Sequence, residues 1–292
     1  MSLAVAQRDE TADAARSGGL NFRAVAQRRL GALTPILAPI FAQWLLPVLI
    51  IAVWQAAVSS GLLSTHILPA PSDVVAAAVR LLKSGELLRN MWVSFWRAMI
   101  GFVIGGGIGF AFGLANGLSR RCEAVFDSTL QMVRNIPHLA LIPLVILWFG
   151  IDETAKIFLV ALGVFFPIYI NTQHGIRTVD PQLVEMGRIY GMSPAELFWR
   201  VLLPGALPSI FVGVRFGLGI MWLTLIVAET IAASSGIGYM AMQAREFLLL
   251  DVVVLSIVIY ALLGKAADSA ARVLERVCLS WHPAFQKTMR RA

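Results

Sequence analysis

Charged side chains are scarce in this chain, and their scarcity indicates its class. Asp, Glu, Lys and Arg make up 14% of the 292 residues, whereas hydrophobic residues make up 58%. A soluble domain usually carries about 25% charged residues. The composition therefore excludes a single soluble domain and predicts an integral membrane protein.

The absence of several sequence motifs excludes further classes of function. The only two cysteines, Cys122 and Cys278, support neither a disulfide framework nor a cysteine-based metal site. No G-x-x-x-x-G-K-[ST] phosphate loop is present, so the chain has no ATP site of this kind. No HExxH motif, GxSG-type elbow or carboxylate pair within a span supports an intramembrane enzyme. We therefore predict no catalytic, cofactor-binding or metal-binding residues.

A net charge of +7 is compatible with nucleic-acid binding, but the pattern of basic residues is not. Aromatic residues are not interleaved with basic ones, and zinc-finger spacing is absent. Basic residues of membrane proteins collect instead at the cytoplasmic face. We therefore predict a lipid bilayer, and no nucleic acid, as the chain's surroundings.

Uncharged runs long enough to cross a bilayer predict six spans and an all-α polytopic fold. Residues 34–58 carry no charge over 25 positions, and about 20 apolar residues cross the hydrocarbon core. We expect a polar, poorly ordered cytoplasmic tail over residues 1–33, a transmembrane domain over 34–283 and a basic cytoplasmic tail over 284–292. The other spans are predicted at about residues 98–119, 125–149, 157–172, 207–228 and 252–267.

Two of these spans have unusual compositions. The second has glycines at positions 101, 105, 109, 113 and 117, a row at i+4 spacing that favours close helix packing over a hinge. The third contains Pro137 and Pro143 together with polar side chains in its first half. Helix breaks and polar groups at membrane depth are tolerated where they face protein or a water-filled path.

Residues 179–208 form a polar interruption between the fourth and fifth spans. Asp180 can cap a helix that has Pro181 at its first position, and Gly191 suits the left-handed residue that ends it. Ser193 and Glu196 match an S-x-x-E capping box, with Pro194 in the first turn of a second helix. Pro204, followed by Pro208, is predicted to end that second helix.

The distribution of Lys and Arg predicts the orientation. With the N-terminus inside, the inner segments hold 15 of these residues and the outer segments hold 6. The positive-inside rule therefore places both termini and the polar interruption in the cytoplasm. Residues 72–82 are interpreted as an amphipathic helix at the outer surface, capped by Ser72 and Asp73.

The polar interruption resembles the EAA loop of permease subunits in bacterial ATP-binding-cassette importers. Glu185, Gly191, Leu203 and Pro204 fall in register with its pattern E-A-A-x3-G-x9-I-x-L-P, whereas Met186 and Gly187 replace the usual alanines. WRAMIGF at residues 96–102, FPIYINT at 166–172, and the longer segments 134–163 and 203–242 resemble the aliphatic-sulfonate permeases of the taurine, nitrate and sulfonate group. The resemblance covers about residues 44–283, and residues 1–40 depart from it.

The resemblance implies a type I importer permease in the bacterial inner membrane, working as a homodimer. A partner ATPase that binds ATP and Mg would dock on a coupling loop of residues 179–204, and a periplasmic binding protein would deliver aliphatic sulfonates. The predicted ATPase-coupling residues are Glu185, Gly191, Ser193, Glu196, Leu203 and Pro204. Glu185 is expected to be an ion-pair or cap partner and not a catalytic group.

An intramembrane arginine is a candidate functional residue, and a sulfonate is a permanent anion. The predicted path residues are therefore Arg134, Asn135, His138 and Arg215, with Trp222 as an apolar gate. Four of them also have a structural interpretation: Arg134 can snorkel to the inner face, Arg215 can cap carbonyls or pair across the dimer, His138 can bind a carbonyl, and Trp222 can pack in the core.

Two alternatives stay open on the sequence. The same architecture could import taurine, nitrate or another small anion. A secondary transporter is disfavoured, because we find neither inverted repeats nor paired coupling-ion sites, and the acidic candidate Glu229 lies at the end of a span.

Overall fold

The computed structural model describes residues 45–65 and 67–281. The predicted tails, residues 1–33 and 284–292, and the start of the first predicted span lie outside the described residues. The chain divides into two compact units, Met1–Ser64 and Thr65–Ala292. Within the described part of the first unit, Leu45–Ser59 forms an apolar helix, which is the described portion of the first predicted span.

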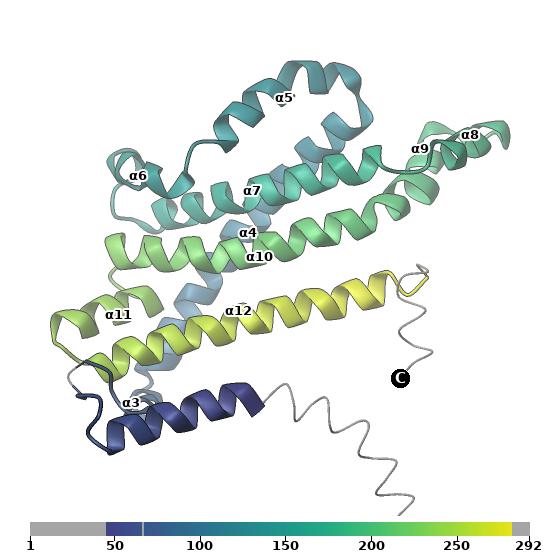
Figure 1. Ribbon diagram of the computed structural model, residues 1–292. Helices are drawn as coiled ribbons and strands as arrows, with labels where there is room; N and C mark the ends of the chain where they lie inside the picture. Colours follow the sequence, from purple (N-terminus) through teal and green to yellow (C-terminus); the bar gives the residue numbers. More distant parts are fainter. Residues whose placement is uncertain (1–44, 66, 282–292) are drawn as a thin grey trace, which may run out of the picture. The chain divides into compact units, whose positions relative to one another are not determined.

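The described part of the second unit is helical and contains no strand (Figure 1). Its elements are, in chain order, α3 (Pro71–Lys83), α4 (Glu86–Leu118), α5 (Arg120–Arg134), η1 (His138–Leu141), α6 (Ile142–Phe149), α7 (Glu153–Arg177), α8 (Pro181–Ile189), α9 (Pro194–Leu197), η2 (Phe198–Leu202), α10 (Leu203–Ala232), α11 (Ile237–Glu246) and α12 (Leu250–Cys278).

Four of the five predicted spans of this unit coincide with helices, which are longer than expected. Four apolar helices within the described residues are long enough to cross a membrane: α4, α7, the run Pro194–Ile231 that contains most of α10, and α12. The third predicted span is instead a pair, Arg120–Arg134 and His138–Phe149, bent by 79°. The break lies before Pro137, because a proline disfavours helical conformation in the residue that precedes it. Pro143 causes no break, since it occupies the first turn of α6.

The first helix of the unit is capped differently from the prediction. Its N-cap is Ala70, Pro71 opens the helix, and the Asp73 carboxylate accepts the Ala70 backbone N–H at 3.3 Å. Asp73 therefore contributes to the cap as expected, whereas Ser72 is not the N-cap residue, because Pro71 already occupies the first helical position.

The glycine row of α4 lies directly against α7. A Cβ added at Gly105 would lie 2.6 Å from both the Cα and the carbonyl carbon of Ala161, and one at Gly113 would lie 2.6 Å from Thr172 Cβ. Gly109 and Gly117 meet α7 in the same way. The row is therefore a packing surface that brings two helix backbones together, as its spacing predicts.

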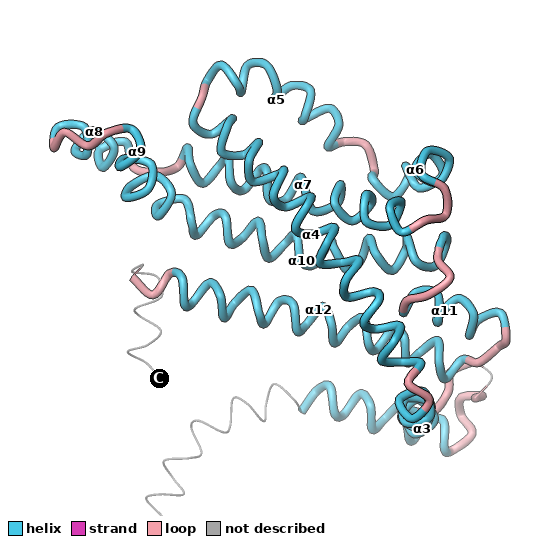
Figure 2. Tube along the Cα trace, turned by 180° about the vertical axis from the view of Figure 1, so that it is seen from behind, coloured by secondary structure: helices cyan, strands magenta, loops and turns pink. Residues whose placement is uncertain are grey.

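The short helices form two groups, which lie at opposite ends of the long helices. Figures 1 and 2 show α8 and α9 at one end of α7 and α10, and α6 and α11 at the other end. α10 packs between α7 and α12. At the end nearer α8, α5 is tied to α7 by the Arg177–Glu123 ion pair and by the Tyr169 hydroxyl, which donates to Asp127 at 3.1 Å.

Candidate functional site

The segment of residues 179–204, called the coupling segment below, has the predicted caps. The Asp180 carboxylate accepts the Gln182 backbone N–H at 2.9 Å, and Pro181 opens α8. Gly191 follows the end of α8 with φ +75°, the left-handed conformation that a Cβ disfavours. Ser193 and Glu196 form the reciprocal capping box, in which Glu196 accepts the Ser193 N–H at 2.9 Å. The helix, glycine turn, helix prediction is confirmed.

The predicted end of the second helix at Pro204 is wrong. α9 continues through the π-helical turn η2 into α10, which contains both Pro204 and Pro208. A proline inside a helix lacks its N–H, and its ring clashes with the carbonyl four residues earlier, here that of Arg200. Arg200 lies within η2, where the wider turn accommodates the ring, so the chain stays helical.

One face of the coupling segment is exposed and largely apolar. Leu183, Met186, Ile189 and Tyr190 are 47–78% exposed. Glu185, also on α8, is exposed and makes no ion pair with any described residue, so no ion-pair partner is found for it within the described chain.

Other residues of the coupling segment pack within the segment and on the bundle. A Cβ at Gly187 would lie 2.7 Å from Leu197 Cδ1, which explains the small residue at that position. Leu203 packs against a buried cluster of Ile176, Val179, Ala206 and Ile210. The segment is thus fixed to α7 and α10 while it presents an apolar surface with an exposed carboxylate.

The predicted path residues are not gathered in one place. Arg134 and Asn135 are exposed at the break between α5 and η1. The His138 ring, on η1, lies 3.1 Å from the Thr224 hydroxyl of α10, so its partner is a hydroxyl and not the expected carbonyl. Trp222 is 6% exposed and packs edge-on against Tyr260, which favours the core interpretation over a gate.

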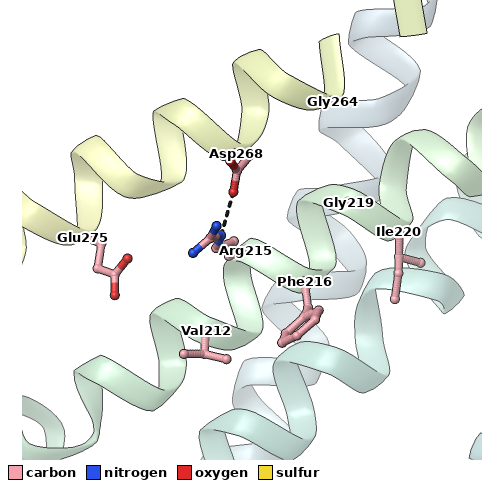
Figure 3. Close-up of a pocket in the computed structure, with 8 residues that line it drawn as sticks. All are labelled: Val212, Arg215, Phe216, Gly219, Ile220, Gly264, Asp268 and Glu275. Carbon is pink, nitrogen blue, oxygen red and sulfur yellow. Dashed lines mark hydrogen bonds and ion pairs between the residues drawn. The ribbon is translucent and has the colours of Figure 1, made fainter. Parts of the chain in front are cut away.

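Arg215 lies apart from these residues, in a hollow between α10 and α12. Its Nε donates to Asp268 Oδ1 at 2.6 Å, so its ion-pair partner lies within the chain and not, as expected, across a dimer (Figure 3). The hollow has a volume of about 450 Å³, and Arg215 is the residue of the predicted path that lines it. The five predicted path residues therefore occupy at least three separate environments.

A buried polar network at the α11 end of the bundle was not predicted. The Glu229 carboxylate of α10, with 0% of its side chain exposed, accepts hydrogen bonds from Ser94 at 2.8 Å, Arg97 at 2.8 Å, the Gly238 N–H at 2.9 Å and Tyr260 at 3.1 Å. The same Arg97 guanidinium pairs with Glu153 of α7 and donates to the Ser235 carbonyl at 2.6 Å. Glu229 and Arg97 thereby connect four helices and the start of α11.

The turn before α11 is built around this carboxylate. Gly236 has φ +111°, and a Cβ there would lie 2.5 Å from Glu229 Cδ. The Gly236 and Ile237 N–H groups donate to Asn90 at 3.0 Å and to Ser94 at 2.9 Å. The sequence offers one signal of this arrangement, namely charged residues at the ends of apolar runs. That signal places Arg97 in an outer segment and Glu229 at a span end, but it does not pair them.

Comparison with known proteins places this arrangement in a family. Residues 105–277 match the family described as binding-protein-dependent transport system inner membrane component. An aliphatic sulfonates transport permease protein, SsuC, of Escherichia coli (strain K12) is 66% identical over 84% of this chain and 93% of its own length. A protein with the same name from Bacillus subtilis (strain 168) is 47% identical over 83% of this chain and 88% of its own length.

A solved structure shares the fold. The crystal structure of an amino acid ABC transporter with histidines superposes with a TM-score of 0.56 at 18% identity, over 68% of this chain and 97% of the other. The fold, the matched residues and these relatives agree, and the chain belongs to the family of binding-protein-dependent transport system inner membrane components, the membrane permeases of ABC importers.

Proposed function

We propose that this chain forms the translocation path for aliphatic sulfonates in an importer driven by ATP hydrolysis on a partner subunit. The observation that supports this cargo assignment is the 66% identity with the Escherichia coli protein named for aliphatic sulfonates, over 84% of the chain. A second protein of that name, 47% identical, supports the same cargo. The permease works as a homodimer, and a periplasmic binding protein supplies the sulfonate.

The partner ATPase docks on the exposed face of the coupling segment. Three features support this: the apolar side chains Met186 and Tyr190 are exposed, Glu185 makes no ion pair with a described residue, and both helices of the segment are capped. A hydrophobic patch with a polar group is the usual composition of a protein interface. Closure of the ATPase pair would move α8 and α9 and, through them, α7 and α10. Both chain termini lie on this cytoplasmic side, as the Lys and Arg distribution predicts.

A deletion strain tests the cargo. A strain without this gene should fail to grow with an alkanesulfonate as its sulfur source and should grow on sulfate, because the sulfonate no longer enters. Growth yields are measured on both sources, with a plasmid copy of the gene as control. Normal growth on alkanesulfonates, with a defect on taurine or nitrate, would assign the cargo to that anion instead.

Substitution at Gly191 tests the docking surface. Gly191→Val should abolish co-purification of the ATPase while leaving the amount of permease in the membrane unchanged. The reason is conformational: φ is +75°, and a Cβ added at this position would meet no heavy atom within 4 Å, so the strain arises in the backbone and not from a clash. A β-branched residue in the left-handed region costs about 1–3 kcal/mol, so the turn between α8 and α9 changes.

The matched control is Gly191→Asn, because asparagine tolerates the left-handed conformation. This variant should retain the ATPase. Equal recovery of the ATPase with the valine and asparagine variants would count against docking at this turn.

A further inference from the structure

The hollow between α10 and α12 has two kinds of lining. Charged side chains, Arg215 from α10 and Asp268 and Glu275 from α12, line it together with apolar side chains of α10 (Figure 3). The apolar residues are Val212, Phe216 and Ile220, and two glycines, Gly219 and Gly264, complete the lining. Its volume of about 450 Å³ falls within the usual range for small-molecule sites.

Only part of the Arg215 guanidinium is hydrogen-bonded to the described residues. Its Nε donates to Asp268 Oδ1 at 2.6 Å, and Arg272 holds the other oxygen of the same carboxylate, Oδ2, at 2.6 Å. Asp268 therefore shares its charge between two guanidiniums. Among the described residues, no hydrogen bond is formed by the terminal Nη1 and Nη2 groups of Arg215, whose side chain is 48% exposed.

The two glycines leave room beside the charged groups. A Cβ at Gly219 or at Gly264 would meet no heavy atom within 4 Å. A side chain could be added at either position without displacing the fold, so open space extends over both glycines. Together, a partly uncompensated guanidinium and an adjacent apolar space match a ligand with an anionic head and a short alkyl chain.

We propose that this hollow is a transient binding site for the cargo, resting on the proposed function of sulfonate import. The terminal Nη groups of Arg215 donate to the sulfonate oxygens, Asp268 and Arg272 position that guanidinium, and the space at Gly219 and Gly264 admits the alkyl chain. Glu275 opposes anion binding at its end of the hollow, so the site holds the cargo weakly, as a transport path requires.

Two substitutions separate this site from a merely structural ion pair. The measurement is ATP-dependent uptake of ethanesulfonate and of octanesulfonate into proteoliposomes containing the full complex, at saturating loaded binding protein. Arg215→Gln should lower uptake of both sulfonates roughly tenfold, the loss expected for a hydrogen bond to a charged group. Asp268→Asn should lower uptake less, by about threefold, because Arg215 retains its charge and loses only one of the groups that position it. A structural pair predicts equal losses in both variants, and that result would overturn the proposal.

Filling the apolar space tests the alkyl part of the site. Gly264→Leu should lower octanesulfonate uptake at least roughly fivefold relative to ethanesulfonate, because the added side chain occupies space that the long chain needs. The matched control is Gly107→Leu on α4, where a Cβ also meets no atom within 4 Å and which does not line the hollow. An unchanged ratio of the two uptakes in Gly264→Leu would overturn the role of this space. If the wild-type complex itself imports neither sulfonate, the proposed function fails and not the site alone.

Discussion

Glu229→Ala is expected to destabilise the permease more than any other single removal of a side chain. Glu229 has 0% of its side chain exposed and accepts four hydrogen bonds, from Ser94, Arg97, Gly238 and Tyr260. Its loss leaves the Arg97 guanidinium, 3% exposed, without one of its two carboxylates. Breaking a buried ion pair by removing one partner costs about 3–5 kcal/mol. The midpoint of thermal unfolding of the purified permease in detergent measures the loss.

Glu185→Ala is the matched control, since Glu185 is exposed and forms no ion pair with a described residue. It should change the free energy of unfolding by less than about 0.5 kcal/mol. The double variant Arg97→Ala with Glu229→Ala should lose less stability than the sum of the two single variants, because neither charge is then left without its partner. A midpoint of Glu229→Ala equal to that of Glu185→Ala would contradict the role of the network.

Gly105→Ala is expected to have the second large effect, although it adds one methyl group. The added Cβ would lie 2.6 Å from the Cα and from the carbonyl carbon of Ala161, so α4 and α7 must separate. Backbone atoms cannot turn aside as a side chain can, and overpacking typically costs about 1–3 kcal/mol, occasionally more. We expect a lower unfolding midpoint and a smaller yield of monodisperse permease on gel filtration.

Gly107→Ala provides the comparison, two residues further along the same helix. A Cβ at Gly107 meets no heavy atom within 4 Å, and alanine is the better helix former by about 1 kcal/mol. This variant should be as stable as the wild type or slightly more stable. If both alanine variants unfold at the same temperature, close approach of α4 and α7 at Gly105 is not what stabilises this pair.

Local chemistry predicts most of the elements. Uncharged runs indicate the spans, and the caps at Asp180, Ser193 and Glu196 are predictable because a cap depends on residues within four positions of one another. The glycine row is predictable for the same reason, since its i+4 spacing is local to one helix. The helix with which it packs, α7, does not follow from that spacing.

Features that depend on distant residues do not follow from local patterns. Glu229 interacts with Ser94 and Arg97, more than 130 positions earlier, so no local pattern predicts the pairing. Proline usually ends a helix, which is why an end is predicted at Pro204, but a π-helical turn accommodates it. The path residues predicted by residue type are scattered, since type alone does not specify which face of a helix a side chain occupies.

The unbroken helical run Pro194–Ile231 has a mechanical consequence. Its 38 residues make a rod about 57 Å long at 1.5 Å rise per residue. The capping box of Ser193 and Glu196 is attached at one tip, and Glu229 is fixed near the other. A tilt of about 5° around the midpoint of such a rod displaces the two tips by about 2.5 Å in opposite directions. A movement imposed on the capping box therefore moves the Glu229 carboxylate through the helix itself, without a relay of side chains between them.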